Sequence, residues 1–245
     1  MLNTLARPGQ DLLFDPALTS RAPGGSPPVV QCLIGGEWCG DGDVAVTDPA
    51  DGTTIARVPD LGADGARRAI AAASRAFPGW SNRLAKDRAR ILRRWFDLVV
   101  ENTEPLARLL TREQGKPLAE ARGEIAYAAS YIEFYAEEAK RLYGETIPTH
   151  SKDGRIIVLR QPIGVVAAIT PWNFPAAMIT RKLAPALAAG CTTVLKPALE
   201  TPLTALALAR LAQQAGLPDG CINVVTGDAP AIGGEFCDSS EVRAL

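Results

Sequence analysis

The sequence lacks most of the features that mark metal, disulfide-bonded and membrane proteins. It contains one histidine, His150, and its five cysteines form no Cys-x-x-Cys pair, so a zinc site built from Cys and His is not expected. The odd number of cysteines argues against a disulfide framework. No apolar stretch is long enough to cross a bilayer, and Met1–Leu13 lacks the basic start and apolar block of a secretory signal. We therefore expect a cytoplasmic protein without a membrane span or a metal site.

Neither sign of charge is in excess. The chain has 26 Lys plus Arg and 27 Asp plus Glu, which gives a net charge of -1. A nucleic-acid partner would require a basic field, so none is expected. With 245 residues, 47% of them hydrophobic and 22% charged, the chain is long enough for one large domain or two small ones around a sizeable core.

The beginning of the chain predicts an arm followed by short strands. Residues 1–30 end in the turn-rich segment Arg21–Pro28 and are predicted to form a flexible N-terminal arm. Val30–Trp38 and Val44–Val58 are interrupted by turn signals and predict short strands in a small antiparallel unit.

Apolar residues at helical spacing predict four helices between residues 64 and 144. The first is expected to open after Asp64 as its N-cap and to stop at Pro78. The third is expected to end at Gly115. The fourth and longest is expected to begin at Pro117 and to close at Gly144.

After Gly154 strands and helices alternate. The expected strands are Arg155–Arg160, Gly164–Ile169, Cys191–Leu195, Cys221–Val225 and Val242–Leu245, with helices over 176–189 and 202–215. Right-handed crossovers would make the strands Gly164–Ile169, Cys191–Leu195 and Cys221–Val225 parallel, and ligands of such sheets bind beyond the carboxyl ends of the strands. We therefore predict an α/β fold with a doubly wound parallel sheet and N-terminal helices, and a ligand site where three strand ends converge.

The strand ends carry no Gly-x-Gly-x-x-Gly, so the pattern alone leaves the ligand open. However, the run from Thr170 to Pro175 (TPWNFP) after one strand, and Lys196-Pro197 after the next, resemble the aldehyde dehydrogenase family, most closely its succinate-semialdehyde dehydrogenase branch. The other segments that carry the resemblance are Ile34–Trp38, Glu113–Leu118, Ile179–Lys182 and Asn223–Gly227. The resemblance implies the Rossmann-like cofactor-binding domain of that family, with its N-terminal part at 31–148, an oligomerisation hairpin at 149–160 and a βαβ core at 161–245.

The resemblance also implies roles for individual residues. Asn173 would direct a side-chain N–H at the oxygen that becomes negative when a thiolate adds to an aldehyde. Arg181 would hold the far carboxylate of a semialdehyde substrate with its planar fork of donors. The implied cofactor-binding residues are Thr170, Pro171, Trp172, Asn173, Lys196, Pro197, Ala198, Leu199 and Gly227. Each residue also has an ordinary alternative without a ligand. Asn173 would be a loop residue, Trp172 a core aromatic residue, Lys196 a solvated charge, Gly227 a loop glycine and Arg181 a partner in a surface salt bridge.

The choice between NAD and NADP depends on the third residue after Lys196. Many members of the family place Glu there, where its carboxylate accepts a hydrogen bond from the ribose 2′-hydroxyl and repels a 2′-phosphate. This chain has Leu199 instead, with Glu200 one position later. The usual selector for NAD is therefore missing, and we expect NADP or NAD as cofactor.

In this family the nucleophilic cysteine and the general-base glutamate lie further along than residue 245. We therefore expect the chain to be the N-terminal half of an NAD(P)-dependent aldehyde dehydrogenase that lacks the catalytic domain and is inactive alone. The full-length protein would oxidise a small aldehyde, in the first place succinate semialdehyde to succinate. Through the 149–160 hairpin the full-length protein would form a homo-oligomer. The alternatives are a non-catalytic truncated chain that binds nucleotide or associates with intact relatives, and a piece of a longer gene product. An uncovered sheet edge at Val242–Leu245 predicts poor solubility.

Overall fold

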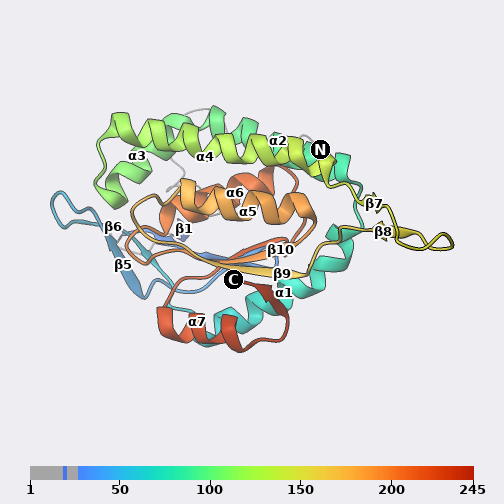
Figure 1. Cartoon of the computed structure of the whole chain (residues 1–245). Coiled ribbons are helices and arrows are strands. Elements are labelled where there is room, and N and C mark those ends of the chain that lie inside the picture. The colour runs from blue at the N-terminus through green and yellow to red at the C-terminus, as the bar shows by residue number, and fades with distance from the viewer. Residues whose placement is uncertain (1–18, 21–26) are drawn as a thin grey trace, which may run out of the picture.

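The computed structural model describes residues 19–20 and 27–245 (Figure 1). Most of the arm predicted for residues 1–30 lies outside the described residues. A six-stranded sheet has the order β12-β9-β10-β11-β3-β4. Its strands are β3 (Cys32–Ile34), β4 (Glu37–Cys39), β9 (Val165–Ile169), β10 (Thr192–Lys196), β11 (Ile222–Val224) and β12 (Val242–Ala244). Strands β9, β10 and β11 are parallel, as predicted, and β12 pairs parallel with β9 at the predicted sheet edge.

The N-terminal strands do not form a separate antiparallel unit. Strand β3 pairs antiparallel with β11 and turns through Gly35 and Gly36, which both have positive φ, into β4. The hairpin therefore extends the main sheet. A second sheet has the order β1-β2-β6-β5. It consists of β1 (Thr19–Ser20), β2 (Val29–Val30), β5 (Val44–Thr47) and β6 (Thr54–Val58).

Helices cover both faces of the six-stranded sheet (Figure 1). Their bounds are α1 (Gly62–Ser81), α2 (Ala85–Glu101), α3 (Thr103–Gln114), α4 (Leu118–Glu138), α5 (Ala177–Ala189), α6 (Leu203–Gln214) and α7 (Ala229–Asp238). Helices α1 and α7 pack on one face. Helices α5 and α6 cover the other face, and α2, α3 and α4 form a further layer over them. Strand β10 is consequently buried on both faces. The continuous apolar run of β9 predicts the same for that strand, in which Val165, Ala167 and Ala168 are buried and Ile169 is exposed.

Three predicted helix boundaries are wrong. Helix α1 begins before Asp64, which lies in its first turn without a capping role. The same helix continues past Pro78, because Trp80 is buried and donates its indole N–H to the carbonyl of Leu187, 3.1 Å away. Tertiary packing thus overrides the helix-breaking tendency of proline in the last turn.

Gly144 does not close the longest helix. Helix α4 ends at Glu138 and is followed by a 3₁₀ turn over Ala139–Arg141. Gly144 instead begins a two-stranded ribbon, where a Cβ would lie 2.2 Å from the carbonyl oxygen of Val158. The glycine is therefore explained by close approach of two backbones.

The ribbon consists of β7 (Glu145–Ile147) and β8 (Ile156–Val158), paired antiparallel, and it projects from the body of the molecule (Figure 1). Its first strand precedes the predicted start at residue 149. Ile157 is 65% exposed and Leu159, directly after β8, is 74% exposed. Among the described residues, no helix combines the length and the apolarity that crossing a bilayer requires.

Candidate functional site

The three predicted strand ends meet at one edge of the sheet. Ile169 of β9 is paired with Lys196 of β10, and Leu195 is paired with Val224 of β11. The Thr170 amide donates to the carbonyl of Lys196, at 3.1 Å. The segments that follow the strands therefore begin side by side, which confirms the predicted convergence.

The loop between β9 and α5 presents large side chains to solvent. Pro171 and Asn173 are exposed, Trp172 is 54% exposed, and Phe174 is 44% exposed. A tryptophan this exposed is not a core aromatic residue, so that alternative is excluded. Thr170, at the base of the loop, is buried, and its Oγ1 has no hydrogen-bond partner among the described residues.

Lys196 is buried at the end of β10, so it is not the solvated lysine of the ordinary alternative. Its Nζ donates to the carbonyl of Pro197, at 3.0 Å. Burial lowers the pKa of the ammonium group, and the negative charges of Glu200 and Asp228 act in the opposite direction. A compact cation with further donor capacity therefore lies beside the loop that bears Trp172.

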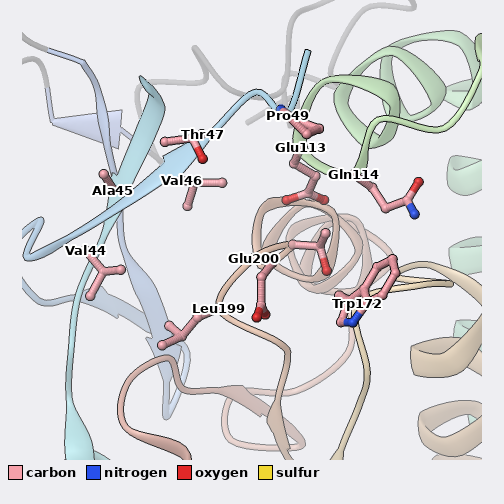
Figure 2. A pocket seen from close by; sticks show the side chains of 11 residues that line it. Val44, Ala45, Val46, Thr47, Pro49, Glu113, Gln114, Trp172, Leu199 and Glu200 are labelled. Carbon is pink, nitrogen blue, oxygen red and sulfur yellow. The ribbon is translucent and has the colours of Figure 1, made fainter. Parts of the chain in front are cut away.

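Pro197 is buried, and Ala198 and Leu199 are half-buried as the chain turns toward α6. A cleft of about 470 Å³ opens beside them, lined by Val44–Thr47 with Pro49, by Glu113 and Gln114 at the end of α3, and by Trp172 and Leu199–Thr201 (Figure 2). Figure 2 shows Glu200 between Leu199 and Trp172. Two buried oxygens at this cleft, Thr201 Oγ1 and Gln114 Oε1, have no hydrogen-bond partner in the described part of the chain.

Glu113 holds the N-terminus of α6. Its carboxylate accepts from the Leu203 amide at 2.7 Å, from the Thr204 amide at 2.8 Å and from the Thr204 hydroxyl. Burial raises the pKa of Glu113 to about 7, against the opposing effect of these hydrogen bonds. The Glu113 carboxylate, at the end of α3, thus occupies the N-terminus of α6, a position that otherwise attracts anionic ligands.

Glu124 of α4 caps α5 in the same way. Its Oε1 accepts from the amides of Ala176 and Ala177, at 2.9 and 3.3 Å, and its Oε2 accepts from Lys116. Lys116 also donates to the carbonyl of Asn173, at 3.2 Å. Sequence reasoning missed Glu113, Lys116 and Glu124 as structural parts of the site. Two of them lie in the matching segment Glu113–Leu118, which was the available signal.

Gly227 follows β11 and is buried with φ +136°. A Cβ at this position would lie 2.1 Å from Asp60 Oδ1. The next carboxylate, of Asp228, caps α7 by accepting from the Ala231 amide at 2.9 Å. Packing against Asp60 therefore accounts for the glycine without any ligand, and its predicted contact with the cofactor stays a prediction.

Arg181 lies on the exposed side of α5 without a carboxylate partner among the described residues. Its guanidinium lies over the ring of Tyr131, 5.6 Å from the centroid, and Nη1 is 3.7 Å from the sulfur of Met178. The alternative of a surface salt bridge is therefore not what the structure shows.

The cysteines are unsuited to nucleophilic chemistry at this site. Cys32, Cys191 and Cys221 are buried, as expected for small core residues. Burial raises the pKa of Cys32 to about 11 and that of Cys221 to about 12, which keeps both as thiols. Cys39 lies in β4 and Cys237 is exposed on α7, on the opposite face of the sheet from α5 and α6.

Comparison with known proteins agrees with this geometry. The chain is 61% identical over 219 residues to a glutarate-semialdehyde dehydrogenase of Pseudomonas putida, and the matched residues cover 88% of this chain and 45% of that protein. It is 62% identical over 218 residues to the NADP(+) succinate-semialdehyde dehydrogenase GabD of Escherichia coli (strain K12), with the same coverage. The crystal structure of a succinate-semialdehyde dehydrogenase from Burkholderia pseudomallei superposes with a TM-score of 0.87 at 55% identity, over 94% of this chain and 46% of that one.

The chain thus spans less than half the length of the relatives it matches. The match to the family description "Aldehyde dehydrogenase family" extends over residues 38–245. The fold and the loops at its strand ends agree with this match, and the chain belongs to the aldehyde dehydrogenase family.

Proposed function

We propose that this chain is the cofactor-binding part of an NAD(P)-dependent aldehyde dehydrogenase that oxidises a semialdehyde, succinate semialdehyde in the first place, to the dicarboxylic acid. In the overall reaction aldehyde, water and NADP⁺ give the acid, NADPH and a proton. The observation that carries the proposal is the meeting of the exposed Trp172-Asn173 loop with the buried Lys196 at one sheet edge. The names of the relatives support the same reaction.

The residues at the strand ends fit a dinucleotide. Lys196 Nζ has donors left beyond its bond to Pro197, and the unpartnered Thr170 Oγ1 lies at the foot of the same loop. Both groups suit the hydroxyl or phosphate oxygens of an adenosine ribose. When bound, the nicotinamide would supply the hydride acceptor. Leu199 gives no carboxylate that would repel a 2′-phosphate, which supports NADP beside NAD.

Asn173 is proposed to act on the aldehyde itself. The loop exposes its side chain to solvent at the strand ends. Its amide N–H would donate to the oxygen that gains negative charge as a thiolate adds to the carbonyl carbon. No cysteine of this site is suited to the attack, so the thiolate and the base that activates the deacylating water are proposed to come from a part of the protein beyond this chain.

Arg181 is proposed to orient the substrate. A guanidinium without a carboxylate partner in the described part of the chain, on the helix that begins directly after the Asn173 loop, suits the distal carboxylate of a semialdehyde. The names of the relatives, glutarate- and succinate-semialdehyde dehydrogenase, support this substrate class.

The proposal is tested by binding and by turnover. Energy transfer from tryptophan to added NADPH should report saturable binding to the purified chain. Lys196→Met should weaken that binding about tenfold, since it removes one charge-assisted contact. Arg243→Gln, on the edge strand β12, is a matched control for loss of one positive charge and should leave the affinity unchanged. No NADP reduction is expected with succinate semialdehyde.

Failure of NADPH and NADH to bind at millimolar concentration would contradict the proposal. Turnover by the chain alone would contradict the assignment of the nucleophile to another part of the protein.

A second candidate function is association without catalysis. The ribbon formed by β7 and β8 projects from the body and exposes Ile157 and Leu159, which favours pairing with a second copy of the chain or with an intact relative. The proposed homo-oligomer of the full protein would use the same ribbon. Sedimentation velocity over a range of concentrations tests this, and a strictly monomeric chain would count against it.

A further inference from the structure

One buried ion pair contacts the loop that bears Asn173. The side chains of Lys116, in the connection between α3 and α4, and of Glu124, on α4, are 10% and 1% exposed. Their partners lie more than fifty positions further along the chain, in the loop after β9 and at the start of α5. The pair therefore joins the outer helical layer to the strand-end site.

The contacts of this pair hold the second half of the loop and the start of α5. Lys116 Nζ donates to the Asn173 carbonyl at 3.2 Å and lies 4.0 Å from the centroid of the Phe174 ring. Glu124 Oε1 accepts from the Ala176 and Ala177 amides. Four of the five positions 173–177 are thus tied to two side chains that also bind each other.

Among the described residues, the backbone carbonyl of Asn173 accepts a hydrogen bond from the Lys116 ammonium alone, while the residue is exposed to solvent. The direction in which the carboxamide points is set by the backbone torsions of residue 173 and by its own two side-chain torsions. Fixing the carbonyl on one side and the Phe174 ring on the other removes the freedom of the peptide plane that precedes α5. Oxyanion donors depend on such preorganisation, because a displacement of about 1 Å costs most of their effect.

We infer that Lys116 and Glu124 are positioning residues, which hold the Asn173 carboxamide in the orientation that its role in the proposed function requires. The role of Asn173 rests on the proposed function, whereas the restraint of the loop by the ion pair is independent of that function.

The test measures the order of the loop in the purified full chain. Lys116→Met keeps the apolar stem and removes the donor to the Asn173 carbonyl. Amide hydrogen exchange in residues 172–177 should become about tenfold faster, as expected for loss of a charge-assisted hydrogen bond, while exchange in β9, β10 and β11 stays unchanged. The ¹⁵N signal of the Asn173 side-chain amide, assigned by its loss in Asn173→Ala, should shift and narrow toward that of a free side chain.

A double variant separates positioning from the cost of a buried charge. Lys116→Met alone leaves Glu124 buried without its cation, so a loss of global stability is expected. Lys116→Met with Glu124→Gln removes both charges and should recover part of the thermal stability, whereas exchange in 172–177 should stay fast. Arg122→Gln is the matched control, since it breaks an exposed pair between Arg122 on α4 and Glu104 on α3 and should leave the loop unchanged.

Unchanged exchange at 172–177 in Lys116→Met, an equal rise throughout the chain, or full recovery of loop order in the double variant would each overturn the inference. NADPH titration of the same samples separates this from the proposed function. An unmodified chain that binds no NADPH while its loop responds to Lys116→Met would contradict the proposed function alone.

Discussion

The stability of the chain should fall as the pH rises toward neutrality, because of Glu113. This carboxyl group is buried at the N-terminus of α6, and its pKa rises from 4.5 to about 7 in the folded chain. The folded state therefore binds more protons than the unfolded state between these two values. The stabilising contribution of the protonated group is fully present below about pH 4.5 and is lost as the pH rises through about 7.

The size of the effect follows from the same two values. The interval between 4.5 and about 7, at about 1.4 kcal/mol for each pH unit, corresponds to about 3 kcal/mol of unfolding free energy. Glu113→Gln removes the titration but keeps a carbonyl oxygen that can accept from the Leu203 or Thr204 amide. The variant should therefore lose this part of the pH dependence and retain a weakened cap of α6.

Urea unfolding followed by circular dichroism, at a series of pH values across the window, measures both profiles. Titrating groups that do not interact with Glu113 cancel in the difference between the parent and the variant, and Glu124 is the carboxylate that does interact with it. That difference should change by about 3 kcal/mol, with the parent losing relative stability as the pH rises. Parallel profiles would refute the raised pKa of Glu113, and a difference of opposite sign would show that the hydrogen bonds outweigh burial. Glu120→Gln, on the exposed side of α4, is the control for an ordinary carboxyl group.

Three further predictions concern the cofactor, the backbone and the ribbon. Leu199→Glu should weaken NADPH binding about tenfold and leave NADH binding unchanged, because a carboxylate beside the ribose repels a 2′-phosphate; equal loss for both nucleotides in parallel titrations would contradict this. Gly227→Ala should lower the free energy of unfolding by about 2 kcal/mol or more, because its Cβ collides with Asp60, whereas Gly79→Ala, in open space on α1, should be neutral or stabilising in the same urea titration. Ile157→Lys should shift sedimentation toward the monomer, and unchanged self-association would exclude the ribbon as the contact surface.

The local order of strands and helices could be predicted well from the sequence, because short-range patterns determine it. The run Val165–Ile169 is apolar throughout, and glycines in the left-handed region follow α3 and α5 at Gly115 and Gly190. These signals lie within a few residues of the elements they define. The meeting of the strand ends then followed from general rules for parallel sheets.

The support of the site could not be predicted in this way. Glu113 and Glu124 occur in helices rich in charged residues, where a carboxylate ordinarily faces water. Their partners lie 90 and 52 positions further along the chain, at Leu203 and Ala176. Nothing in the local pattern indicates burial of these two side chains. The hairpin of β3 and β4 was misjudged for the same reason, since its pairing with β11 is a long-range contact.

The placement of β3 also affects how the chain acquires its shape during synthesis. The thiol of Cys32 lies 3.1 Å from the hydroxyl of Thr226, across a separation of 194 positions. At the usual pace of translation this partner leaves the ribosome roughly 10–40 s after the cysteine. The hairpin of β3 and β4 therefore has no partner strand in this sheet until β11 has been synthesised, and its edge stays open to pairing with other chains during that interval.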